Sequence, residues 1–231
     1  NSEKMSKSLG NIFSIKDVLK NYHPEVVRLF IVQSHYKSYI DFSDDALAEA
    51  RTGMERFYST LKNINDVLEK EIDFTGLSSK DLTGNNAEVY AKIGELPEKF
   101  VEAMDDDFNT ARALGYIFDA VRLINGYLAE KDFTPSPESL FVLDTAKGYI
   151  REVGKVLGLF LEDPDEYFEI DRKREAHKRG LDMDEIEHLI AERRDARAAK
   201  DWARADSIRD SLAEKGVVLK DSPIATDWKI V

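Results

Sequence analysis

Hydrophobic residues recur through most of this chain with the period of an α-helix. The longest stripe begins after Ser43 and covers about seven turns. It contains Leu47, Ala50, Met54, Phe57, Leu61, Ile64 and Leu68. Ser43, with Asp44 and Asp45 after it, has the composition of a helix N-cap and first turn. A helix of this length needs packing along its whole side, so the stripe predicts the main core.

Two shorter helices are expected before this stripe, over residues 15–22 and 24–35. Pro24 stands where a first helical turn accepts proline. Residues 39–42 look extended. Three further amphipathic helices are expected after a polar connection at 71–86: one over about 87–104, one after Asn109 to Leu128, and one from Ser136 to about 163. Together with the long stripe they predict a four-helix bundle.

The last third of the chain differs from the rest in its composition and in the elements it predicts. Residues 166–182 are highly charged and predict a solvated linker helix or hinge. A helix follows from a capping box at Asp182, and a second helix from Asp201 to a stop at Gly216. Residues 217–220 and 226–230 read as two short strands. The expected fold class is mainly α, with a small α+β domain and a short β-hairpin at the end.

Composition narrows the kind of protein. The 231 residues include 42% hydrophobic and 34% charged residues, and no stretch reaches the roughly 20 apolar residues that span a bilayer. No leader is evident at the amino end, so we expect a cytoplasmic monomer with no membrane contact. With no cysteine and four scattered histidines, we expect no metal site. The acids at 105–107 could offer oxygens to a cation, but consecutive residues point apart, which favours helix capping instead.

Charge is unevenly distributed along the chain. The net charge is −12, yet residues 1–40 and residues 193–220 each carry +3, while residues 41–192 carry −17. A polyanion should therefore be attracted to the two ends and repelled by much of the middle.

The basic amino end contains two lysines, Lys4 and Lys7, on a short polar segment before Gly10. Mobile ammonium groups at this spacing suit the separating phosphates of a nucleotide. A solvated, frayed terminus would have the same charges. The uninterrupted run Lys4, Met5, Ser6, Lys7 and Ser8 is more specific than its charges, because it resembles the KMSKS signature of class I aminoacyl-tRNA synthetases.

The basic segment near the carboxyl end contains Trp202 directly after the expected cap, with several Lys and Arg residues around it. An exposed indole beside guanidinium groups is suited to stacking on an unpaired base. Asp206 and Asp221 could accept hydrogen bonds from a base edge. The alternative is that Trp202 fills the gap between the last two helices and the cations are a solvated face.

Four segments together resemble the carboxy-terminal half of the cysteinyl-tRNA synthetase family. They are residues 4–11, residues 33–43, residues 104–110 and residues 193–210, and they occur in order along the chain. The resemblance implies four regions. Residues 1–42 would be the end of the catalytic domain with a helical stem-contact fold, residues 43–165 a DALR-type helical bundle, residues 166–182 the charged linker, and residues 183–231 the anticodon-binding domain.

The resemblance also implies roles for individual residues. Lys4, Met5, Ser6, Lys7 and Ser8 would bind ATP with its Mg²⁺, and Lys7 would be catalytic by stabilising the departing pyrophosphate. Trp202 would stack at the anticodon of tRNA(Cys). Its bases, GCA, would be read by Arg197, Asp206, Arg209 and Asp221.

The chain departs from the family by what it lacks. It contains no HIGH-type ATP motif, no zinc ligands for selecting cysteine, and no nucleotide-binding half before the lysine loop. We therefore expect it to bind tRNA but not to charge tRNA alone, its partner being the missing amino-terminal half. Two alternatives stay open at this point: part of a related ligase that joins cysteine to an amino-sugar, which should lack the basic tail, and a helical protein-interaction module.

Overall fold

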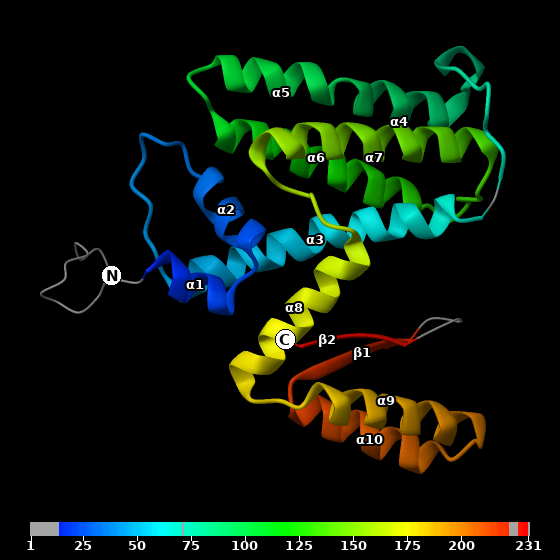
Figure 1. Ribbon diagram of the computed structural model, residues 1–231. Coiled ribbons are helices and arrows are strands. Elements are labelled where there is room, and N and C mark those ends of the chain that lie inside the picture. The colour runs from blue at the N-terminus through cyan, green and yellow to red at the C-terminus, as the bar shows by residue number, and fades with distance from the viewer. Residues whose placement is uncertain (1–13, 71, 222–225, 231) are drawn as a thin grey trace, which may run out of the picture. The chain divides into compact units, whose positions relative to one another are not determined.

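The computed structural model describes residues 14–70, 72–221 and 226–230 (Figure 1). It divides into two compact units, the first ending at Phe168 and the second beginning at Glu169. Within the described residues, none of the helices has the length and apolar character needed to cross a bilayer.

The first unit is helical. Its elements are α1 (Ile15–Asn21), α2 (Pro24–Val32), α3 (Asp44–Leu68), the short 3₁₀ helix η2 (Ser79–Asp81), α4 (Gly84–Gly94), α5 (Leu96–Asp105), α6 (Thr110–Leu128), α7 (Pro137–Leu157) and the first turn of α8 (Pro164–Arg179). Figure 1 shows α4 and α5 following one another along α6 and α7, with α3 as the long helix of the unit. The expected bundle is confirmed.

The core of the first unit is formed largely by the stripe expected on α3. Six of its seven members are buried, from Leu47 to Ile64, and they pack with buried residues of the other helices. The start of α3 is set by Ser43, whose hydroxyl accepts the Ala46 N–H at 3.2 Å. Asn109 caps α6 in the same way, through the Arg112 N–H at 3.1 Å. Side-chain caps thus place the helix starts where the sequence indicated.

The prediction of a single helix over 87–104 is wrong. The helix is interrupted at Glu95, and Pro97 stands in the first turn of the second helix, α5. Proline has no N–H to continue the hydrogen-bond ladder of a helix, which explains the break. The helix expected to continue to 163 also ends earlier, at Leu157, because Gly158 adopts a left-handed conformation with φ of 67°.

The second unit contains most of α8, then α9 (Met183–Ala198), α10 (Trp202–Glu214), β1 (Val217–Asp221) and β2 (Thr226–Ile230). The strands pair antiparallel, with Val217 opposite Ile230, as the expected hairpin. The small core of this unit is formed by Ala176, Ile186, Ile208, Leu212, Val217 and Ile230. Residues 164–179 form a helix, but Tyr167 and Ala176 on it are buried, so this segment is not solvated along its whole length.

Candidate nucleic-acid interface

A tight corner joins α9 to α10 and places the residues that the sequence singled out. Lys200 adopts a left-handed conformation with φ of 60°. The N–H of Asp201 then reaches back to the Ala196 carbonyl at 2.8 Å, and the Asp201 carboxylate accepts the Arg204 N–H at 3.1 Å. The end of one helix and the start of the next are therefore both fixed by hydrogen bonds.

Trp202 is the first residue of α10 and is 59% exposed. The interpretation that it fills the gap between the last two helices is therefore wrong. A large aromatic side chain with this exposure, held on a defined corner, offers a surface on which a base can stack.

Asp206 and Arg209 follow Trp202 on α10 at positions that share its face, four and seven residues on. Both are exposed, and Arg209 Nη1 lies 3.3 Å from Asp206 Oδ1. A carboxylate acceptor and guanidinium donors thus stand side by side on the helix face that begins with Trp202. Opposed donor and acceptor groups are what base edges in a single strand require.

The other two expected anticodon residues lie on neighbouring elements. Arg197 is exposed in the last turn of α9. Asp221 is the last residue of β1, which leaves the carboxyl end of α10, packs against that helix and runs back toward the corner (Figure 1). Its side chain is outside what the structure describes, as are the ATP-loop residues Lys4, Met5, Ser6, Lys7 and Ser8.

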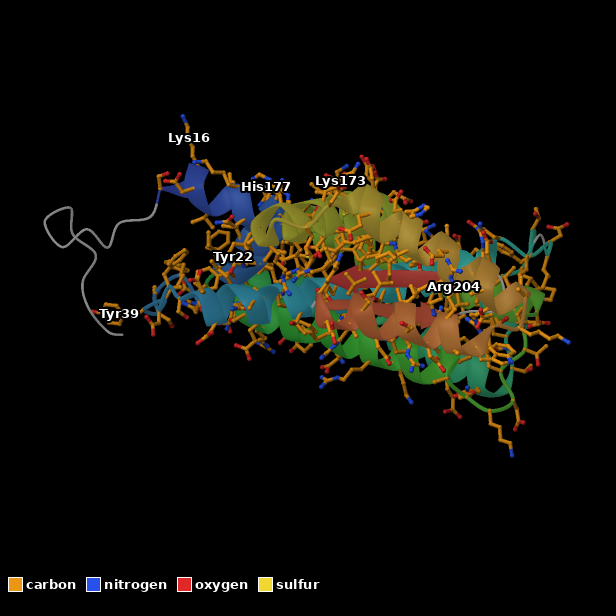
Figure 2. The ribbon with its side chains drawn as sticks, turned by 90° about the horizontal axis from the view of Figure 1, so that it is seen from below. Lys16, Tyr22, Tyr39, Lys173, His177 and Arg204 are labelled. Carbon is orange, nitrogen blue, oxygen red and sulfur yellow. The ribbon has the colours of Figure 1, made fainter. Side chains whose placement is uncertain are left out.

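Arg204, also on α10, forms an ion pair within the second unit. Its Nε and Nη2 donate to one oxygen of Glu192 on α9, at 3.0 and 2.8 Å. This contact ties the two helices together, and the Glu192 carboxylate raises the pKa of Arg204 further. Figure 2 shows Arg204 on this helix pair. No local pattern in the sequence indicates this contact, because the two residues are twelve positions apart across a corner.

The hollow beside Arg204 is acidic. It has a volume of about 590 Å³, and its lining includes Glu192, Asp195 and Asp201 against the one guanidinium. Three carboxylates would repel a polyanion. The face with Trp202, Asp206 and Arg209 is therefore the better candidate for RNA.

The described residues form no metal site. No group of three His, Asp or Glu residues among them could hold a metal ion, so they do not fit the zinc site of the resembled family. Within the acidic run, Asp107 accepts the Tyr36 hydroxyl at 2.8 Å and pairs with Lys37. Lys37 and then Tyr36 lower the pKa of Asp107. Asp106 pairs with Arg112 at 3.4 Å. These two acids thus engage side chains of the fold.

Three family models match consecutive parts of the chain. They are the class I (C) tRNA synthetase catalytic domain over residues 1–52, the DALR domain over residues 99–162, and the cysteinyl-tRNA ligase anticodon-binding domain over residues 183–228. The last contains the α9–α10 corner. The fold and the matches together place the chain among the class I aminoacyl-tRNA synthetases.

The curated relatives of the chain point to one family within this class. The chain is 49% identical over 230 residues to the cysteine–tRNA ligase of Geobacter metallireducens and 47% identical to that of Geobacter sulfurreducens. It is 39% identical to that of Nitratidesulfovibrio vulgaris. Each match covers all of this chain but only 45–46% of the relative, so the chain spans about half their length. By homology along its whole length, the chain belongs to the cysteine–tRNA ligase family.

Proposed function

We propose that this chain is the tRNA-binding part of a cysteine–tRNA ligase and that its second unit recognises the anticodon of tRNA(Cys). The observation that carries the proposal is the exposure of Trp202 on a fixed corner, with Asp206 and Arg209 on the same face. The match of residues 183–228 to an anticodon-binding domain supports it. The amino-sugar alternative would lack this segment.

Recognition would combine stacking with base-edge contacts. The Trp202 ring stacks on an unpaired base, a contact worth about 1–3 kcal/mol per base. Arg197, Asp206, Arg209 and Asp221 then select among bases by their donors and acceptors. The stacking term tolerates every base, so discrimination for GCA comes from the charged groups.

The complete ligase would activate cysteine with ATP and Mg²⁺ and transfer it to tRNA. In that reaction Lys7 stabilises the departing pyrophosphate and Lys4 helps to hold the nucleotide. The 231-residue chain does not charge tRNA by itself, because its sequence has no HIGH-type motif and no thiolate zinc ligands. Cysteine-dependent pyrophosphate exchange should give no turnover above background, and robust turnover would refute this part of the proposal.

The test of anticodon recognition compares two transcripts. A tRNA with the anticodon GCA and the same tRNA with all three anticodon bases changed are titrated against the chain at several salt concentrations. The GCA transcript should bind at least tenfold more tightly, and both affinities should fall as salt rises, because phosphate contacts release counterions. Equal affinities for the two transcripts would contradict anticodon recognition and favour a protein-interaction module.

A further inference from the structure

Lys200, just after the carboxyl end of α9, has a backbone conformation that is unusual for a residue other than glycine. After α7, α8 and α10 the left-handed position is occupied by Gly158, Gly180 and Gly216, with φ of 67°, 64° and 78°. After α9 the same conformation is adopted by Lys200, with φ of 60°. A side chain is disfavoured there, because its Cβ approaches the backbone, and glycine is the common residue at this position.

Among the described residues, the Lys200 side chain has no polar partner that would offset this strain. Its ammonium group is exposed and has no hydrogen bond or ion pair with any described residue. Lys173 and Lys215 in the same unit pair instead with Glu169 and Glu185. Lys173 lies on α8 (Figure 2). The corner needs this conformation but not a lysine to adopt it, and backbone strain is often associated with function.

The position of Lys200 suggests what the ammonium group does. It lies two residues before Trp202, on the same corner, and its N–H donates to the Arg197 carbonyl at 3.0 Å. The neighbouring Asp201 carboxylate is already used to cap α10. A strand whose base stacks on Trp202 must bring a backbone phosphate to the side of the ring, within reach of a flexible four-carbon side chain.

We propose that Lys200 binds the backbone phosphate of the nucleotide that stacks on Trp202. The proposal rests on the anticodon recognition proposed above and adds a contact that is independent of base identity. Phosphate contacts fix the position of a nucleic acid, whereas base contacts specify its sequence. Lys200 would therefore set the affinity and the salt dependence of binding without changing the preference for GCA.

The experiment uses Lys200→Gly, Lys200→Arg and, as a matched charge control on α8, Lys173→Gln. Affinity for the GCA transcript is measured against salt, and stability is measured by urea unfolding. For Lys200→Gly, the slope of log affinity against log salt should decrease by about 0.7, the value for one phosphate contact with a single strand. That slope corresponds to roughly fivefold weaker binding at 0.1 M salt. The unfolding midpoint should rise, because glycine relieves the left-handed strain.

Lys200→Arg should keep the slope and the affinity. Lys173→Gln removes one positive charge away from the corner, so it should change the slope and the affinity much less than Lys200→Gly does. The ratio of affinities for the two transcripts should stay the same in every variant. An unchanged slope in Lys200→Gly would overturn the phosphate contact even if GCA is still preferred. A lower unfolding midpoint would assign Lys200 to folding instead. Failure of the unmodified chain to prefer GCA would overturn both proposals.

Discussion

The buried carboxylate of Glu25, in the first turn of α2, accepts a hydrogen bond of 2.8 Å from the hydroxyl of Tyr58 on α3. The same carboxylate accepts the backbone N–H groups of Phe160 and Leu161 at 2.8 and 2.9 Å. The Tyr58 hydroxyl in turn accepts the Glu162 N–H at 3.2 Å. One carboxylate thus joins α2, α3 and the segment between α7 and α8.

Glu25→Ala should strongly destabilise the first unit. It removes the acceptor for three donors, and a buried donor without a partner costs about 1–3 kcal/mol. We expect a loss on the order of 3 kcal/mol or more in urea unfolding followed by circular dichroism. Tyr58→Phe is the matched control, because it removes one hydroxyl and keeps the carboxylate, and it should cost about 1–2 kcal/mol. Equal losses in the two variants would show that Glu25 does not organise this cluster.

Stability should fall at alkaline pH in a way that depends on Tyr58. Burial first, and then the Glu25 carboxylate, raise the pKa of Tyr58 above its ordinary value of 10.0. Above about pH 10 the unfolded chain releases a proton that the folded chain keeps, so this contribution is complete below pH 10 and is lost as pH rises.

The measurement is the unfolding free energy of the unmodified chain and of Tyr58→Phe between pH 8 and 11. The stability of the unmodified chain relative to the variant should be constant up to about pH 10 and then fall by about 1.4 kcal/mol per pH unit. A difference that stays constant through pH 11 would contradict a raised pKa.

Two glycines of α7 should respond in opposite directions to alanine. A Cβ at Gly154 would clash with the buried Phe160 ring, whereas a Cβ at Gly148 would meet nothing within 4 Å. Gly154→Ala should destabilise by about 1–3 kcal/mol through overpacking. Gly148→Ala should stabilise by about 0.5–1 kcal/mol through helix propensity. Thermal unfolding of both variants tests this, and a loss in Gly148→Ala would contradict the packing described here.

Trp202→Ala should weaken tRNA binding by about 1–3 kcal/mol with little change in stability, because the ring is exposed and stacks only on RNA. Trp228 is the matched control. Its ring lies 5.2 Å from the Arg172 guanidinium carbon within the second unit, so Trp228→Phe should keep tRNA affinity. In the Trp228→Phe background, the remaining Trp202 fluorescence should be quenched by the GCA transcript. A large loss of stability in Trp202→Ala, with tRNA affinity unchanged under conditions where the variant is folded, would assign the ring to the fold.

Local signals in the sequence predicted most of the helices. Ser43, Asn109, Ser136, Asp182 and Asp201 were each expected at a helix start, and each caps one through its side chain. The α3 stripe was expected in the core and is buried there. The break at Glu95 was missed because the apolar spacing continues through Pro97, although the proline was the available signal.

The sequence by itself determined where most of the helices begin, which of their faces are apolar, and which residue types could bind phosphates and bases. These properties depend on neighbours within about one turn. Tertiary structure decided how the charged and aromatic side chains are used. Arg204 pairs with Glu192 across a corner, Glu25 meets Tyr58 from another helix, and Trp202 is left exposed. The partners of these side chains, and their access to solvent, are set by segments distant in the chain, and no local pattern encodes that arrangement.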